Sequence, residues 1–395
     1  MFTTNKTAEA ILRGQMDEAR ASLAAGEPLT GNDIENNRQQ IFSNIIRHRA
    51  FDLVDAFIKA GLIQTDVYEY DSFDRSFFCN IARDLQDDEA SIAFLRDFLQ
   101  NTENINDEVK DQTLLGYCLD MGARPAVIQC LIDVGCDVRY TNNAGRNFIH
   151  QVVGKPMMAE EKGISYLSLL LARGLDLNEK DITGQTPLIM AVKAHKTGYI
   201  TFLLQHGAHP NETDEQGNTA FYYAAAEQFD PETFSLLCEY AMPGFELTNR
   251  DGNTLFTGFM RMMQGGSTDM TLLSQLLQAG ASFAQTGLYY GAPKSGLDWL
   301  AEKKANVLEY AVSNGNLDPD QQDDQGNTLL HKVCAYPVNF DADTARETYK
   351  KVKILLDAGA NAAITNDKDE TPQQLAQQDN LKIKTVELLM RHQAR

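Results

Sequence analysis

The sequence predicts an all-α fold, a solenoid of about ten to eleven helix-turn-helix units with short turn or hairpin fingers and polar end caps. Three observations predict it. One pattern recurs about every thirty-three residues or a little more, its copies open on an Asx-to-Gly turn, and most of them close on a Leu-Leu-x-x-Gly element. Because a stacked repeat contacts only its neighbours, the 395 residues need not divide into two or three compact domains.

The period rests on a Thr-led corner at the start of the first helix of each unit. Equivalent positions are Thr113, Asn147, Thr186, Thr219, Thr254, Ser295, Thr328 and Thr371, separated by 34, 39, 33, 35, 41, 33 and 43 residues. A fixed unit with occasional loop insertions explains these gaps better than chance spacing. The Thr hydroxyl can cap the helix that follows it, and Pro187 and Pro372 suit the first helical position.

Each unit opens with a turn that carries Gly three residues after Asp or Asn, as in Asp214 to Gly217. The Asx side chain bonds its own backbone and Gly accepts a positive φ, so a tight turn is expected. A short helix follows, then a second helix that ends in Leu-Leu and Gly-Ala, as at Leu355 to Gly359. There Gly supplies a left-handed C-terminal cap.

Taken in this order, the motifs resemble the ankyrin repeat, a turn plus two antiparallel helices stacked into a curved array. The resemblance is strong over residues 107–395 and degenerate over 1–106. We expect residues 1–106 to form a divergent N-terminal cap with degenerate repeats, 107–365 the ankyrin array, and 366–395 a C-terminal capping repeat. A separate helical bundle is the alternative for residues 1–106.

Composition narrows the choice of partners. The chain has 55 acidic against 35 basic residues, a formal charge of -20, which repels nucleic acid and anionic lipid and attracts basic proteins. Residues 1–10 do not look like a signal peptide, and no stretch approaches eighteen apolar residues. The six cysteines include no CxxC pair, which indicates buried free thiols in a reducing compartment. We therefore expect a cytoplasmic protein without nucleic-acid or membrane partners.

The sequence contains no recognisable catalytic signature: GxSxG, HExxH, the Walker loop and GxGxxG are all missing. His150 and His331 occupy the histidine of the TPLH corner, which in the ankyrin family bonds the adjoining turn. The acidic run from Asp318 resembles a calcium loop, but its sixth residue is Asp323 where an EF-hand needs Gly. We expect no catalytic residue, cofactor or metal.

A row of residues just after the corner is the first candidate for partner binding. In ankyrin proteins this position points into the concave groove, so the resemblance implies that the row lines such a groove. The row consists of Tyr117, Gln151, Met190, Tyr223, Gly258, Trp299 and Lys332. Tyr, Trp and Met are among the residues that dominate binding energy at interfaces, which favours a contact surface. The alternative is that these side chains pack against neighbouring repeats.

The finger tips are the second candidate, because long loops that carry aromatic residues are usually functional. One such segment contains Tyr68, Tyr70 and Phe73, and a lengthened finger contains Tyr289 and Tyr290. The other tip residues expected to contact the partner are Glu215, Gln216, Arg250 and Asp324. Between residues 65 and 108, twelve acids stand against three arginines, which suggests a basic surface opposite.

These patterns predict a non-enzymatic protein-binding module, monomeric when unbound, that holds a folded and basic partner by its groove and finger tips. It would inhibit that partner, in a toxin-neutralising or immunity-type role, or recruit it as an adaptor. The alternative is a secreted effector that acts in a foreign cell, with a targeting or catalytic activity in residues 1–106. A third possibility is a purely structural spacer, which would not need an aromatic row.

Overall fold

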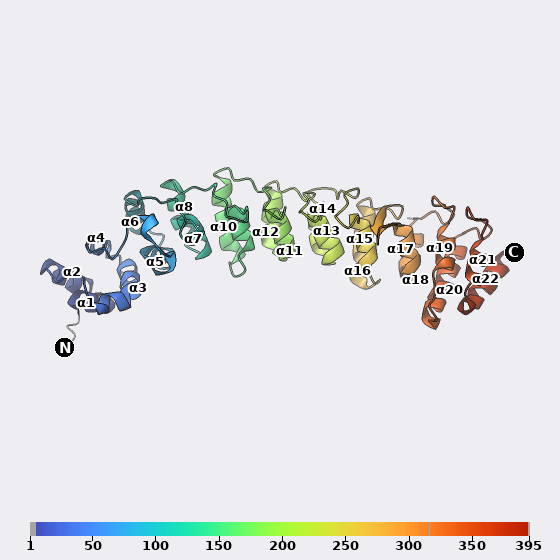
Figure 1. The fold of residues 1–395 in the computed structure, drawn as a ribbon, viewed down its shortest axis with the longest axis horizontal. Coiled ribbons are helices and arrows are strands. Elements are labelled where there is room, and N and C mark those ends of the chain that lie inside the picture. The colour runs from blue at the N-terminus through green and yellow to red at the C-terminus, as the bar shows by residue number, and fades with distance from the viewer. Residues whose placement is uncertain (1–4, 316, 394–395) are drawn as a thin grey trace. The chain divides into compact units, whose positions relative to one another are not determined.

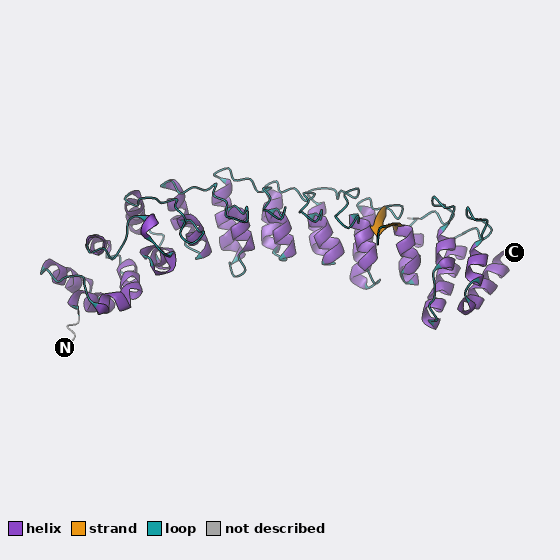
Figure 2. Ribbon diagram, viewed as in Figure 1, coloured by secondary structure: helices purple, strands orange, loops and turns teal. Residues whose placement is uncertain are grey.

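The computed structural model describes residues 5–315 and 317–393. The expectation that residues 1–10 are not a signal peptide concerns, in residues 1–4, a part of the chain outside the described residues. The chain forms two compact units, Met1–Ala208 and His209–Arg395, and each is described by itself. The described residues form eleven consecutive helix pairs and a single two-stranded sheet (Figures 1 and 2). The prediction of an all-α repeat solenoid with turn and hairpin fingers is confirmed.

The first unit consists of six helix pairs with three short 3-10 turns. Its helices are α1 (Lys6–Leu12), α2 (Met16–Ala24), α3 (Asn32–Arg47), α4 (Val54–Lys59), α5 (Phe77–Asp84), α6 (Glu89–Gln100), α7 (Leu114–Asp120), α8 (Pro125–Asp133), α9 (Phe148–Gly154), α10 (Glu160–Leu171), α11 (Pro187–Lys193) and α12 (Thr197–Gln205). The 3-10 turns are η1 (Phe51–Leu53), η2 (Val67–Glu69) and η3 (Phe73–Arg75).

Helices of the first unit stack in register from pair to pair. Helix α5 packs on α7 and α7 on α9, while α6 packs on α8 and α8 on α10, so the same pairing runs on both sides of residue 106. In the degenerate pairs phenylalanines fill the core: the ring of Phe42 lies 5.3 Å from that of Phe77, which lies 5.3 Å from that of Phe98. Aromatic burial supplies the stacking energy that Leu pairs supply in the regular repeats.

The second unit consists of five helix pairs and the hairpin. Its elements are α13 (Ala220–Tyr222), the π-helix η4 (Tyr223–Glu227), α14 (Pro231–Cys238), α15 (Leu255–Met262), α16 (Ser267–Gln278), β1 (Thr286–Tyr289), β2 (Ala292–Ser295), α17 (Gly296–Glu302), α18 (Ala305–Ser313), α19 (Leu329–Ala335), α20 (Ala342–Asp357), α21 (Pro372–Gln377), the 3-10 turn η5 (Asn380–Lys382) and α22 (Ile383–Gln393). Strands β1 and β2 are antiparallel, with Tyr289 opposite Ala292.

Both ends of the helices form as the sequence predicts. The Thr186 hydroxyl accepts from the Ile189 N–H at 3.3 Å and caps α11, with Pro187 in its first turn. Seven other corners are capped in the same way, at Thr113, Asn147, Thr219, Thr254, Ser295, Thr328 and Thr371. The glycines that follow the second helices, such as Gly207 and Gly359, have positive φ.

The cysteines sit where the apolar pattern placed them. Five of them are buried and Cys238 is half-buried, and all six are free thiols. Burial raises the pKa of Cys136 and Cys334 to about 12, so these thiols stay protonated at neutral pH. They act as small apolar core residues rather than as nucleophiles.

Candidate partner-binding site

The finger tips are rigid turns built by single Asx side chains. In the second unit, Oδ1 of Asp214 accepts from the N–H groups of Gln216 at 2.9 Å and Asn218 at 3.0 Å. The side-chain oxygens of Asn249, Asp323 and Asn366 accept the same pair of backbone hydrogen bonds in their turns. Two features require glycine at position 217: its φ is +78°, and an added Cβ would lie 2.8 Å from Cα of Asn249.

Successive tips are joined to one another through the backbone. Within the second unit the Arg250 N–H donates to the Gln216 carbonyl at 2.8 Å, and the Leu288 N–H donates to the Gly252 carbonyl at 2.9 Å. These bonds hold neighbouring fingers at a fixed spacing. The row of tips is therefore ordered before any partner arrives, which lowers the entropy lost on binding.

The two corner histidines are structural, as the resemblance implies. His150 is fully buried; its Nδ1 lies 2.7 Å from Oδ1 of Asn147 and its Nε2 lies 3.1 Å from the Gln185 carbonyl of the next turn. His331 repeats this geometry with Thr328 and the Glu370 carbonyl. Burial lowers the pKa of both, so both imidazoles are neutral at pH 7.

The lengthened finger is a β-hairpin whose tip is Tyr290 and Gly291. Both residues have positive φ, +48° and +78°, which is the conformation of a type I′ turn. An aromatic residue rarely adopts a positive φ, so the Tyr290 backbone is strained. Its side chain is 91% exposed, and its ring meets that of Tyr289 edge to face at 4.5 Å.

Below this tip, Trp299 of α17 anchors the hairpin. Trp299 is only 6% exposed, and the Tyr289 ring meets it edge to face at 4.9 Å. Nζ of Lys294 lies 3.6 Å from the Trp299 ring centroid and 4.7 Å from that of Tyr289, and the ammonium pairs with Glu302. A cation held between two aromatic faces and a carboxylate fixes the angle between the hairpin and α17.

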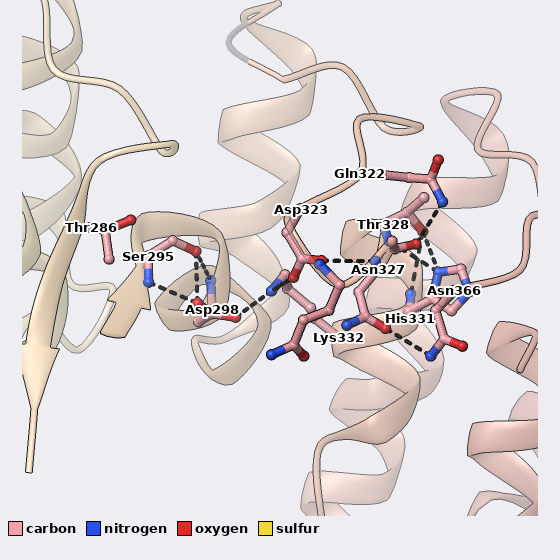
Figure 3. A network of polar contacts seen from close by, with 12 residues as sticks. Thr286, Ser295, Asp298, Gln322, Asp323, Asn327, Thr328, His331, Lys332 and Asn366 are labelled. Carbon is pink, nitrogen blue, oxygen red and sulfur yellow. Dashed lines mark hydrogen bonds and ion pairs between the residues drawn. The ribbon is translucent and has the colours of Figure 1, made fainter. Parts of the chain in front are cut away.

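A charged network continues from α17 to the next finger (Figure 3). Nζ of Lys332 lies 2.6 Å from Oδ1 of Asp298 and 2.5 Å from Oδ2 of Asp323. Burial opposes ionisation of Asp298, but the Lys332 ammonium and the Ser295 donors outweigh it and hold the pKa of Asp298 below its ordinary value. Burial likewise disfavours the Lys332 cation, and its two carboxylate partners outweigh that and raise its pKa.

A small cleft of about 300 Å³ lies between the hairpin and the finger tip at residues 321–324. Thr286 and Pro293 line one wall, Gln322 and Asp324 the other, and Lys332 is part of its lining. Asp323 accepts hydrogen bonds from two backbone N–H groups and from Nζ of Lys332. Among residues 5–315 and 317–393 no group of three metal-binding side chains gathers.

Residues of the predicted row pack mainly against their neighbours. In the first unit, Tyr117 is buried with its ring 5.2 Å from that of Phe73, Gln151 donates to the Gly116 carbonyl at 2.8 Å, and Met190 abuts Gly154. In the second unit, the buried Tyr223 donates to Oδ2 of Asp214 at 2.5 Å, and Tyr222 covers Gly258. This placement favours the packing alternative for the row.

The predicted tip residues, in contrast, lie at the surface. Glu215, Gln216, Arg250 and Asp324 are exposed on the fingers of the second unit. In the first unit Tyr68 is 78% exposed, while Phe73 is buried and the half-buried Tyr70 donates to the Gln64 carbonyl at 2.6 Å. Tyr68 and Tyr290 are therefore the aromatic tips that a partner can reach directly.

Sequence reasoning missed two contributors to this surface. Lys294 was not singled out, although its spacing of five residues before Trp299 places a cation beside an aromatic finger. Arg261 was also missed; its guanidinium lies 5.5 Å from the Tyr289 ring centroid. No linear signal identifies Arg261, because α15 and the hairpin meet only through the stacking of two repeats.

Paired helices joined by capped, rigid fingers define a helical repeat protein. Residues 157–251 match a family model described as ankyrin repeats, in three copies. The ankyrin domain of Bcl-3 superimposes with a TM-score of 0.50 at 22% identity, over 63% of this chain and 100% of that one, which shows the fold. Residues 157–251 are thus identified as ankyrin repeats, and the fold of the chain is that of an ankyrin-repeat array, which suggests a protein interaction module.

Two relatives show how far the similarity extends. NF-kappa-B inhibitor delta of Mus musculus is 28% identical over an alignment of 248 positions that covers 54% of this chain and 73% of that protein. Protein PhlB of Serratia liquefaciens is 31% identical over 152 residues, 38% of this chain and 63% of PhlB. The chain thus spans less than two thirds of PhlB. Within the described residues, none of the helices combines the length and apolar character needed to cross a membrane.

Proposed function

We propose that this protein is a non-enzymatic binding array that holds a folded partner protein on its finger tips. The observation that carries the proposal is Tyr290, 91% exposed at the tip of an ordered hairpin. A strained, exposed aromatic residue is costly for a free protein, and the Trp299, Tyr289 and Lys294 stack keeps it in place. Exposed tyrosines on rigid supports are typical binding hot spots.

Within this proposal the buried and exposed residues have different parts. Tyr68, Tyr290 and the polar tips contact the partner, whereas the buried row holds the fingers in position. The row residues Tyr117, Gln151, Met190, Tyr223, Trp299 and Lys332 would then affect affinity through the shape of the site. Tyr289 supports the Tyr290 tip, and Tyr70 and Phe73 pack against each other in the segment that carries Tyr68.

Charge supports a basic partner for the first unit. Tyr68 stands among exposed acids, Glu69, Asp71 and Asp74, in a segment with twelve acids and three arginines between residues 65 and 108. Such a surface attracts a basic protein over a Debye length of about 10 Å at 0.1 M salt. The chain charge of -20 supports the same choice and disfavours nucleic acid.

Binding by a preformed array suits inhibition by coverage as well as recruitment. The name of the mouse relative, NF-kappa-B inhibitor delta, describes a protein that inhibits another. We extend that role to this chain as one outcome of binding, in an immunity-type or adaptor function in the cytoplasm.

Affinity capture with the full-length chain tests the proposal. The immobilised protein is incubated with extract of its source cells at about 50 mM and about 300 mM salt, and bound proteins are quantified. We expect a basic protein whose recovery falls at the higher salt. We also expect Tyr290→Ser and Tyr68→Ser each to reduce its recovery about tenfold, as hot spots do.

Tyr240→Ser is the matched control, because Tyr240 is an exposed tyrosine that lies outside the finger tips. Its recovery of the same protein should equal that of the wild type. The proposal fails if both tip variants capture the same proteins as the wild type, or if every captured protein is acidic.

A further inference from the structure

The last two helix pairs form a groove whose chemistry differs from that of the rest of the chain. It lies between α20 and α22 and has a volume of about 570 Å³. Its apolar lining includes Ala345 and Tyr349 from α20 and Leu381 and Leu388 from η5 and α22. Side chains at i, i+3 and i+7 of a helix share one face, so α20 presents Ala342, Ala345 and Tyr349 to the groove as an apolar stripe, opposite Leu381 and Leu388.

The rims of this groove are basic, in a chain that is strongly acidic. Arg346 and Lys350 lie on the α20 side and Lys384 and Arg391 on the α22 side, with Glu387 the one acid of the lining. The four cations are between 61% and 79% exposed, and their ion pairs within residues 5–315 and 317–393 are with acids of their own helix. Such exposed pairs contribute little to stability, so the cations can exchange them for acids of a partner.

The lining also includes a polar atom that the fold leaves unsatisfied. Thr385 is fully buried in the wall of the groove, and its Oγ1 has no hydrogen-bond partner. A Thr in a helix usually donates to the carbonyl four residues earlier, as Thr348 does to Thr344 at 2.9 Å. A buried hydroxyl without a partner carries a free-energy cost, which here falls on the packing of α22 against its neighbours.

The groove exists because α20 is unusually long. It has 16 residues, against 9 in the preceding outer helix α18, and the residues that line the groove, 342–350, are in its first turns. Just before it, Asn339 and Phe340 both have positive φ, and Phe340 is 99% exposed. The extension of α20 supplies one wall of the groove, and Phe340 adds an exposed aromatic ring just before that helix.

We infer that this groove binds an amphipathic helix of a partner protein, with an apolar stripe flanked on both sides by acids. At 1.5 Å per residue, Lys384 and Arg391 are spread over about 10 Å of one rim, and the other rim carries its own pair. A single anionic headgroup would need cations that converge on one point. Two parallel basic rims match a helix with acids along both edges.

Fluorescence anisotropy with the full-length chain tests this inference. The probe is a fluorescein-labelled 18-residue peptide with a leucine stripe and glutamates along both of its edges. Its control has lysines in place of the glutamates. We expect the acidic peptide to bind at least about tenfold tighter, and the double variant Arg346→Glu with Lys384→Glu to lose about tenfold or more.

Matched variants separate the groove from general charge and from stability. Lys59→Glu with Lys353→Glu changes net charge equally on exposed sites outside the groove, and it should alter affinity less than about twofold. Thr385→Val removes the unsatisfied hydroxyl; we expect it to keep or raise the unfolding midpoint and to change peptide affinity less than about twofold, because the buried hydroxyl cannot contact the peptide.

Several outcomes would overturn the inference. An equal loss of peptide affinity in the two double variants would show that the net charge of the chain, and not the groove, controls binding. Equal affinity for the acidic and the basic peptide would show that the basic rims do not select the partner. Binding of dodecanoate without binding of the acidic peptide would assign the groove to a small amphiphile. Self-association that the rim variant abolishes, seen by sedimentation velocity, would assign it to a second copy of the chain.

Discussion

Trp299 connects the packing of the second unit to its exposed finger, and a single substitution measures that connection. Its ring is buried against Tyr289 and beneath Lys294. Trp299→Ala removes both contacts and leaves a cavity, so we expect it to lower the free energy of unfolding by about 3 kcal/mol or more. Urea unfolding followed by circular dichroism checks the value.

Trp299→Phe is the companion variant, because it keeps an aromatic face for Lys294 and loses less volume. We expect less than half of the destabilisation seen with Ala. If the two variants unfold at the same urea concentration as the wild type, Trp299 does not anchor the hairpin.

Individual residues also show what the sequence could and could not predict. Corner capping by Thr186 and the bonds of His150 follow from local spacing of a few residues, and both were predicted. The burial of Tyr117 was left as an alternative to exposure in a groove, because Phe73, whose ring lies against it, is 44 positions earlier in the chain. Exposure of a side chain depends on the neighbouring repeat, and one sequence gives no measure of how closely two repeats approach.

Among the elements, the ends of the first helices show a recurring device. Each helix end leaves carbonyls without partners, and a lysine from the next pair reaches back to them. Lys303 donates to the carbonyls of Arg261 at 3.0 Å and Met263 at 2.9 Å, at the end of α15. Lys196 does the same for α9, and Lys382 for α19. A cation at the C-terminal end also complements the helix dipole.

Removal of one such lysine should loosen the contact between two pairs. We expect Lys303→Met to lower the free energy of unfolding by about 1–3 kcal/mol, since two partly buried carbonyls lose their donor. Lys304→Met is the control, because Lys304 is exposed and adjacent. Thermal unfolding of both variants gives the comparison, and an equal midpoint for the two would contradict the role of Lys303.

The pH dependence of that cost provides a separate prediction. Burial lowers the pKa of Lys303 to about 8, against an ordinary value of 10.5. Between these values the unfolded chain binds more protons at this site, so the contribution of Lys303 to stability increases as pH rises from about 8 toward 10. The neutral amine still donates to both carbonyls. The difference in free energy of unfolding between Lys303→Met and the wild type should therefore grow over this range and stay constant below pH 7. A difference that does not change with pH would refute the lowered pKa of Lys303.

The π-helix η4 is an element that the sequence contained but that local patterns did not reveal. Thr186 precedes the left-handed His195 by nine residues, whereas Thr219 precedes the left-handed Phe229 by ten. The extra residue widens the helix at Tyr223–Glu227 instead of lengthening a loop. Counting residues from the Thr corner to the left-handed residue reveals the insertion in the sequence. The count does not show that the extra residue is accommodated in a helix rather than in a loop.

At the scale of the whole molecule, the repeat period predicts the fold but not its division into units. The gap from Thr186 to Thr219 is 33 residues, the regular spacing, yet the compact units divide between Ala208 and His209. Repeat arrays are held together by nearest-neighbour contacts, whose strength depends on side-chain packing rather than on period. A regular period therefore does not show where the chain divides into units.

The net charge of -20 gives the molecule opposite responses to salt in folding and in binding. Self-repulsion destabilises the compact state, so salt should raise the unfolding midpoint, while screening should slow association with a basic partner. The acids beside Tyr68 belong to the second effect. We expect the triple variant Glu69→Gln, Asp71→Asn and Asp74→Asn to slow that association and flatten its salt dependence.

The triple variant Glu246→Gln, Glu309→Gln and Asp357→Asn is the matched control, because it removes the same charge at three exposed positions. Both variants should raise the unfolding midpoint at low salt by similar amounts, since self-repulsion depends on total charge. Only the first should change the association rate with the captured basic protein, measured by stopped-flow fluorescence at about 20 mM and about 200 mM salt. Equal slowing by both variants would show that the whole field, and not the finger around Tyr68, attracts the partner.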